Sequence, residues 1–182
     1  MAYAGSIGKQ ALRVEARVRR ADLPAADLEA AGTLLLSALR PLLSGRIAAY
    51  ASTGAEPGTA ALLEAVDDIL LPVLRADGDL DWARYEGELV RGLRGTWQPP
   101  GSPLGCDAVA GCTVVVVPAL GVDRAGTRLG QGGGSYDRAL QRTTAYLVAA
   151  LHDGELHDRL PAEPHDRPVD AVVTPSLGLL RL

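Results

Sequence analysis

The chain has 182 residues, the length of one domain, and 47% of its residues are hydrophobic while 22% are charged, a balance that excludes a mainly disordered chain. Its uncharged apolar runs are far shorter than the ~20 residues of a membrane span, so no membrane partner is expected. A net charge of −4 argues against a nucleic-acid binder, which needs a basic face. We expect a single domain over residues 1–182.

The beginning of the chain and its two cysteines both favour a cytoplasmic protein. Residues 1–10 lead directly into a charged stretch and contain no apolar segment typical of a secretory signal. Cys106 and Cys112 are too few for a disulfide scaffold, and they have no second pair with which to form a zinc site. We therefore expect both thiols to be reduced.

The first half of the chain predicts two helices, a strand and a third helix. Residues 7–21 have the apolar spacing of an amphipathic helix, and its polar face is strongly basic. A second helix is expected from a cap at Asp27 to Leu43. A short strand over residues 46–52, a turn-rich loop and a helix over 60–66, capped by Thr59, complete this half.

The second half predicts further strands between loops and a helix. Residues 69–74 indicate a buried strand despite Pro72, residues 82–90 suit a strand or a short helix, and residues 97–105 are expected to be a loop. Four consecutive valines within 112–117 are typical of a strand buried on both faces. A helix over 136–150 and a last strand over 171–174 complete a layered α/β sandwich.

A glycine-rich segment over residues 128–138 carries the strongest chemical information. Four glycines in five residues let backbone N–H groups turn toward an anion, and a helix is expected just after them. A flexible turn is the alternative interpretation. The segment lacks the Gly-Lys-Ser/Thr of a P-loop, and Ser135 stands where the dinucleotide-binding fingerprint needs its last glycine.

The same segment, preceded by Pro-Ala-Leu-Gly-Val-Asp at residues 118–123, resembles the 5-formyltetrahydrofolate cyclo-ligase family, also called methenyltetrahydrofolate synthetases. Weaker matches follow in the family's order along most of the chain: Lys9, Arg13, Tyr50, Ser52, Glu56, Thr59, Trp97, His165, Asp166, Val169 and Asp170. The resemblance implies a three-layer α/β/α sandwich with a mostly parallel central sheet, Rossmann-like in its arrangement.

The resemblance also implies a reaction, a substrate and two cofactors. The family closes the ring of 5-formyltetrahydrofolate to give 5,10-methenyltetrahydrofolate and uses ATP, which leaves as ADP and phosphate. The formyl oxygen attacks the γ-phosphate, N10 then attacks the formyl carbon, and phosphate leaves. Such chemistry needs positive charge and Mg²⁺ around the γ-phosphate. The expected protein is a monomer or weak dimer.

Carried over by position, the resemblance predicts the site residues. Catalysis is expected from Glu56, Tyr136 and Arg138. ATP contacts are expected from Lys9, Arg13, Arg128, Gly130, Gln131, Gly132, Gly133, Gly134, Ser135 and Tyr136. The folate is expected to contact Ala51, Glu56 and Trp97. Mg²⁺ is expected at Asp137 and at Asp166, for which Asp170 is an alternative.

Several positions depart from the family pattern, and they keep other functions open. Gln131, Ser135 and Pro175 replace residues common in the family, and Gly133 stands where lysine is frequent. One alternative is a relative that binds folate or nucleotide without catalysis. Another is an ATP-dependent ligase that acts on a different small amide.

Overall fold

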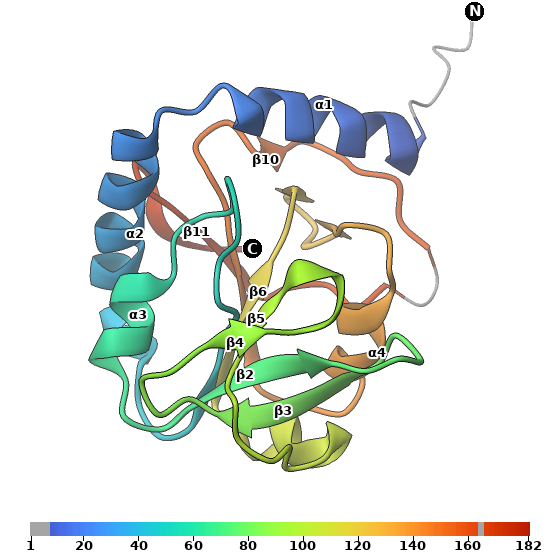
Figure 1. Ribbon diagram of the computed structural model, residues 1–182. Helices are drawn as coiled ribbons and strands as arrows, with labels where there is room; N and C mark the ends of the chain where they lie inside the picture. Colours follow the sequence, from blue (N-terminus) through green and yellow to red (C-terminus); the bar gives the residue numbers. More distant parts are fainter. Residues whose placement is uncertain (1–7, 164–165) are drawn as a thin grey trace, which may run out of the picture.

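The computed structural model describes residues 8–163 and 166–182, so the expectations for Ile7 and His165 lie outside it (Figure 1). The helices are α1 Lys9–Ala21, α2 Ala25–Leu39, α3 Ala60–Ala65 and α4 Ser135–Leu140, with 3-10 turns at Arg40–Leu42, Leu93–Gly95 and Cys106–Gly111. The strands are β1 Ile47–Ala48, β2 Ile69–Leu74, β3 Leu80–Arg84, β4 Val90–Arg91, β5 Trp97–Gln98, β6 Val114–Pro118, β7 Gly121–Asp123, β8 Arg128–Leu129, β9 Tyr146–Ala150, β10 Leu156–His157, β11 Ala171–Thr174 and β12 Gly178–Arg181.

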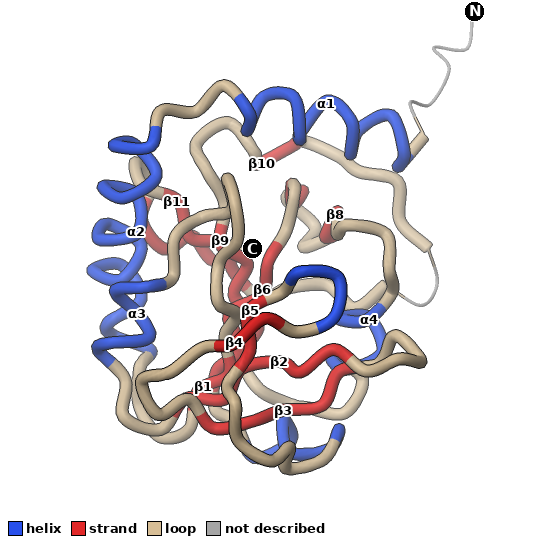
Figure 2. The backbone as a smooth tube through the Cα atoms, in the orientation of Figure 1, coloured by secondary structure: helices blue, strands red, loops and turns tan. Residues whose placement is uncertain are grey.

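A seven-stranded sheet in the order β12-β11-β9-β6-β1-β2-β3 forms the middle of the molecule (Figure 2). From β11 to β2 each neighbouring pair is parallel, whereas β12 and β3 pair antiparallel at the two edges. Parallel strands need both faces covered, and the chain covers them with helices. The predicted three-layer sandwich with a mostly parallel sheet is therefore confirmed.

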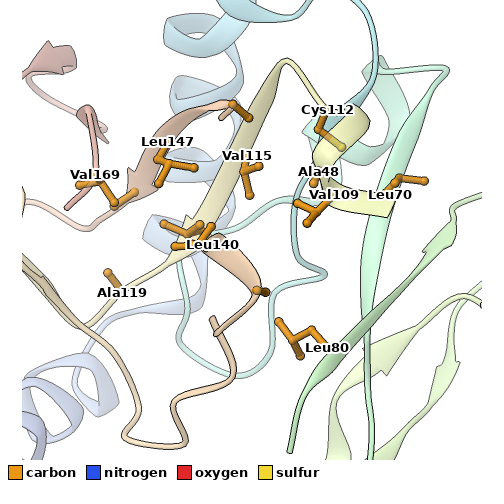
Figure 3. Close-up of a cluster of buried hydrophobic side chains, with 14 of the residues drawn as sticks. Ala48, Leu70, Leu80, Val109, Cys112, Val115, Ala119, Leu140, Leu147 and Val169 are labelled. Atoms are coloured by element: carbon orange, nitrogen blue, oxygen red, sulfur yellow. The ribbon is translucent and has the colours of Figure 1, made fainter. Parts of the chain in front are cut away.

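The valine strand β6 shows how the two faces of the sheet form two cores. Successive side chains of a strand point to opposite faces, so Val115 and Val117 enter one core while Val114 and Val116 enter the other. The first core also holds Leu140 of α4 and Leu147 of β9 (Figure 3). The second core packs against α2, and α2 and α3 lie on the side of the sheet opposite α4 (Figure 1).

Helix α1 packs away from the main sheet, against the three-stranded sheet β10-β7-β8 (Figure 1). Ala16 of α1 shares a small core with Leu129 of β8. The end of the helix is anchored by Arg20, whose guanidinium donates two 2.7 Å hydrogen bonds to the carboxylate of Glu155. Both side chains are buried, so α1 has a fixed position above the main sheet.

The helix predicted over residues 136–150 is wrong in its second half. Helix α4 ends at Leu140, and Tyr146–Ala150 is strand β9, paired parallel with both β6 and β11. Four of the five β9 residues are buried, and an apolar run this short fits a buried strand and a helix equally well by periodicity. Residues 146–150 form a strand because they pair with β6 and β11, which are distant from them in the sequence.

Three other element boundaries also differ from prediction. Helix α2 begins after Pro24, which fits a helix start, so Asp27 lies in the first turn and is not the cap. The helix gives way to a 3-10 turn after Leu39. Strand β1 pairs over only two residues, and the chain beyond Ala48 runs extended toward the cavity described below.

Residues 82–90 contain the end of β3, a loop and Val90, the first residue of β4, so the segment is strand and loop and not a short helix. The predicted strands over 69–74 and 171–174 are confirmed. Cys106 and Cys112 are free thiols, as expected. No helix in the described part of the chain is long and apolar enough to cross a membrane.

Candidate active site

A cavity of about 300 Å³ lies at the carboxyl ends of the parallel strands β1, β2 and β6. In open α/β sheets this end of the strands is where ligands bind. The cavity is lined by Tyr50, Ala51, Thr53, Glu56, Pro72, Leu74, Leu80, Arg94, Thr96, Trp97, Pro118, Ala119, Arg128, Gly130, Gln131, Gly132, Gly133, Gly134, Ser135, Tyr136 and Asp137. It therefore brings together the loop after β1, the β4–β5 hairpin and the glycine-rich segment.

The glycine-rich segment forms one wall of the cavity, and its backbone conformation requires glycine at two positions. Gly132 and Gly134 have φ of +100° and +69°, which side chains disfavour. A Cβ on Gly132 would also lie 3.2 Å from Cζ of Arg13. Arg13 itself donates from Nε to the carbonyl oxygen of Gly130 at 2.9 Å, so a hydrogen bond connects α1 to the glycine-rich loop.

Most cations predicted around this loop already have protein acceptors. Arg128 donates to Asp137 at 2.6 Å, and Lys9 donates to Asp166 at 2.8 Å. Arg138 donates to the carbonyl oxygen of Gly78 in the β2–β3 turn, outside the cavity. Lys9, Arg13, Arg138 and Asp166 are not among the residues that line the cavity. The geometry thus supports Arg13 and Arg128 as residues that shape the loop, and it gives Arg138 no contact with the cavity.

Glu56 lines the cavity on a loop that the strand end holds in place. Its Oε2 accepts hydrogen bonds from the backbone N–H and the hydroxyl of Thr53, at 2.8 and 3.1 Å. The loop is tied back by Tyr50, which donates to the carbonyl of Pro57, and by Thr59, which donates to the carbonyl of Tyr50. The Thr59 hydroxyl makes no cap hydrogen bond to α3, so it stabilises the loop instead.

Tyr136, the second residue of α4, carries a hydroxyl that is buried and has no hydrogen-bond partner among the described residues. Burial raises the pKa of Tyr136 well above its usual value, the nearby Glu56 carboxylate adds to this rise, and Arg128 opposes it. The phenol is therefore neutral at physiological pH. A buried donor without a partner is rare in proteins, which indicates that a ligand completes its hydrogen bonding.

The remaining wall of the cavity is apolar. Trp97 begins β5, and the guanidinium of Arg91 stacks on its ring at 3.9 Å from the centroid. Pro72, Leu74 and Leu80 from the β2–β3 pair continue this wall. A flat aromatic ring system fits such a surface. Sequence reasoning identified Trp97 but missed the β2–β3 residues, because nothing in an apolar strand indicates which side chains border a cavity.

The two carboxylates predicted to bind metal differ in their surroundings. Asp137 lines the cavity beside the glycine-rich loop, and its oxygens suit Mg²⁺, which takes one or two carboxylates together with phosphates and water. Asp166 lies outside the cavity lining and accepts hydrogen bonds from Lys9 and from the backbone N–H of Glu163. Within the described residues no three acidic, histidine or cysteine side chains cluster as metal ligands.

The fold and the cavity together define an α/β protein with a ligand site at the strand ends, where a glycine-rich loop suited to phosphate faces a polar carboxylate and an apolar wall. A family model described as the 5-formyltetrahydrofolate cyclo-ligase family matches residues 6–175. The chain belongs to this family.

Individual relatives agree with the family match. The chain is 39% identical to a 5-formyltetrahydrofolate cyclo-ligase of Mycolicibacterium smegmatis, covering 96% of this chain and 97% of the relative. It is 33% identical to the 5-formyltetrahydrofolate cyclo-ligase of Escherichia coli strain K12, covering 80% of this chain and 86% of the relative. The NMR structure of Aquifex aeolicus 5,10-methenyltetrahydrofolate synthetase superposes with a TM-score of 0.80 at 26% identity, covering 96% of this chain and 92% of the other.

Proposed function

We propose that the protein catalyses the ATP-dependent cyclisation of 5-formyltetrahydrofolate to 5,10-methenyltetrahydrofolate, with release of ADP and phosphate. The observation that carries this proposal is the single cavity lined by the glycine-rich loop, Glu56 and Tyr136, whose buried hydroxyl has no partner among the described residues. Membership of the cyclo-ligase family supports it. The cavity combines a surface for phosphate with one for a flat heterocycle, as a reaction between these two substrates requires.

The two substrates are assigned to opposite walls. The backbone N–H groups of residues 130–134 receive the phosphates of ATP, because glycines let that backbone approach an anion closely. The pterin ring lies against Trp97 and the apolar side chains of β2 and β3. Ala51 has a small side chain at the end of the extended segment after β1, which leaves room for the folate.

The reaction consists of two bond exchanges and the loss of one proton, and the chain supplies groups that bind and orient the substrates. The formyl oxygen bonds to the γ-phosphorus while the bond from that phosphorus to ADP breaks, and N10 then bonds to the formyl carbon while phosphate leaves. N10 gives up its proton. We assign to Glu56, a carboxylate that lines the cavity, the role of accepting that proton or hydrogen-bonding the substrate, and to neutral Tyr136 the donation of a hydrogen bond to an oxygen acceptor.

Mg²⁺ is part of the proposal, with Asp137 as the residue that would hold it. The ion supplies charge neutralisation for the phosphates. One carboxylate oxygen of Asp137, Oδ1, accepts a hydrogen bond from Arg128. We assign the other carboxylate oxygen as the ligand of Mg²⁺. Asp166, engaged with Lys9, remains a prediction as a second ligand.

The proposal extends to the setting in which the protein acts. The folate is its small-molecule partner, and we expect a monomer or weak dimer in the cytoplasm. The two free thiols are in keeping with a reducing compartment.

Product stoichiometry tests the proposed reaction. Purified protein is given 5-formyltetrahydrofolate and ATP, and ADP and methenyltetrahydrofolate are quantified together. We expect equal amounts of the two products, no product when AMP replaces ATP, and loss of activity when a chelator removes Mg²⁺. ADP formation without methenyltetrahydrofolate would refute the assignment of the folate as substrate.

A further inference from the structure

The turn of the β4–β5 hairpin contains an unusual arginine. Arg94 has φ of 55° and ψ of 23°, and it is the one non-glycine residue with positive φ among residues 8–163 and 166–182. Gly95 after it has φ of 75°. Two-residue turns with positive φ at both positions favour Asn, Asp or Gly at the first position, so arginine is strained there.

The turn is held in this conformation by local contacts. Gly92 donates its backbone N–H to the carbonyl of Thr96 at 2.8 Å, and Arg91 donates to the carbonyl of Gly95 at 2.8 Å. Arg91 also stacks on Trp97. None of these contacts involves the Arg94 side chain, so the backbone strain at Arg94 is not balanced by a bond that its guanidinium makes within the hairpin.

The Arg94 side chain lines the cavity on the side of the glycine-rich loop. A Cβ built on Gly133 would lie 3.8 Å from Nη1 of Arg94, so the guanidinium borders the middle of the loop. Strained residues persist where the surrounding structure enforces them, and they occur preferentially at ligand sites. The position of this charge therefore points to an anion held between the hairpin and the loop.

Arg94 differs from the other arginines around the loop in having no hydrogen-bond or ion-pair partner in the described part of the chain. Arg13 donates to Gly130, Arg17 to Gln131, and Arg128 to Asp137. Within the described residues Arg94 forms neither an ion pair nor a hydrogen bond. Its five N–H donors are thus available to a ligand, and their planar arrangement suits the oxygens of a phosphate.

We propose that Arg94 of the β4–β5 hairpin binds the terminal phosphates of ATP beside the middle of the glycine-rich loop. This inference rests on the proposed function, and it adds a nucleotide-binding residue that comes from the hairpin which also carries Trp97. The hairpin would then contact both substrates, the folate through Trp97 and the nucleotide through Arg94.

Calorimetric binding of two nucleotides to the apo protein tests the proposal. The probes are the non-hydrolysable analogue AMP-PNP, which has all three phosphates, and AMP, which lacks the terminal two. The variants are Arg94→Gln, Arg94→Lys and Arg94→Asn, and the matched control is Arg181→Gln, an exposed arginine on the edge strand β12. Thermal unfolding of each apo variant is measured in parallel.

We expect Arg94→Gln and Arg94→Asn to weaken AMP-PNP binding about 10-fold or more, the effect of losing a charge-assisted hydrogen bond, while AMP binding stays within about 2-fold. Arg94→Lys should retain part of the affinity. Arg94→Asn should also raise Tm by about 2–4 °C, because asparagine tolerates positive φ. Steady-state kinetics should show a higher KM for ATP and little change in KM for the folate.

Unchanged AMP-PNP binding in Arg94→Gln would overturn the proposal, and so would equal losses for AMP and AMP-PNP. An increase in the folate KM alone would assign Arg94 to the other substrate and would also overturn it. Failure of the wild type itself to bind AMP-PNP would instead refute the ATP-dependent function on which the inference rests.

Discussion

At the residue scale, Glu56 is held through one oxygen only. Oε2 accepts both hydrogen bonds from Thr53, and Oε1 accepts none from the described residues. We expect Glu56→Gln to lower kcat/KM for 5-formyltetrahydrofolate about 100-fold, the usual contribution of a carboxylate acting in proton transfer. The KM for ATP should change little. Steady-state kinetics measures both, and wild-type kcat/KM in a folded variant would remove Glu56 from the mechanism.

Tyr136 offers a test in which stability and activity change in opposite directions. Removing a buried hydroxyl that has no partner should leave the apo protein as stable as the wild type or more stable by about 1 kcal/mol. The same Tyr136→Phe change should raise the KM of the substrate whose oxygen accepts the Tyr136 hydrogen bond about 10-fold. Urea unfolding and steady-state kinetics give the two values. A less stable variant with an unchanged KM would show that the hydroxyl has a structural role.

Tyr136 and Tyr50 also predict how stability depends on alkaline pH. Burial raises the pKa of both phenols above the value they have in the unfolded chain. Below about pH 10 the folded and the unfolded chain both keep these protons, so the two phenols do not make stability depend on pH. Above about pH 10 the unfolded chain releases the protons while the folded chain keeps them, so the free energy of unfolding falls. Urea unfolding between pH 9 and about 12 should show this decline. The free energy of unfolding of Tyr136→Phe should fall less steeply than that of the wild type, by about 1.4 kcal/mol per pH unit. A slope identical to that of the wild type would contradict the burial of this phenol.

Only the glycine-rich segment was predictable from a local pattern that carries its chemistry. Glu56 and Trp97 were predicted from the resemblance to the family, and both line the cavity together with that segment. Arg138, which was predicted to be catalytic, is not among the residues that line the cavity and donates to Gly78, 60 positions earlier in the chain. Arg94 has no sequence signal at all, since the role proposed for it rests on a backbone conformation and on its position beside Gly133, which is distant in the chain.

At the element scale, the buried ion pair between Arg20 and Glu155 is one of the contacts that position α1. Glu155 accepts two hydrogen bonds from Arg20 and one from the backbone N–H of His152. The ring of His152 contacts the carbonyl oxygen of Ala55, the residue before Glu56. Glu155→Ala would leave the buried guanidinium without its counter-charge and should destabilise the protein by about 3–5 kcal/mol.

Urea unfolding checks this value, with Glu15→Ala as the control. Glu15 lies exposed on the same α1, and its replacement should change stability by less than about 0.5 kcal/mol. Glu155→Ala should also weaken nucleotide binding, because α1 carries Arg13 to the glycine-rich loop. Equal stabilities of the two variants would show that the ion pair does not anchor the helix.

Elements with strong local patterns were predictable, and those fixed by distant partners were not. Helix α1 and strand β6 were evident from an amphipathic period and a run of valines. Strand β9 was predicted as helix because its pairing with β6 and β11 is invisible in a window of sequence. The antiparallel edge strand β12 was missed for the same reason.

At the scale of the whole molecule, the sheet order explains why the site forms where it does. Strands β1, β2 and β6 are adjacent although β2 and β6 are 40 residues apart in the chain, so their carboxyl ends open onto one cavity. No local pattern specifies this order, and the resemblance to the family implied only a three-layer sandwich with a mostly parallel sheet. Alternation of helices and strands indicated only the layered class.

The rise of near-ultraviolet absorbance from methenyltetrahydrofolate tests the central claim most directly. The wild type is mixed with 5-formyltetrahydrofolate, Mg·ATP is added last, and Glu56→Ala, Lys9→Ala and Arg181→Gln are compared with it. We predict a rise only after ATP is added, equal in the wild type and Arg181→Gln, strongly reduced in Glu56→Ala and weakened in Lys9→Ala. A folded wild type that produces no rise would contradict the account.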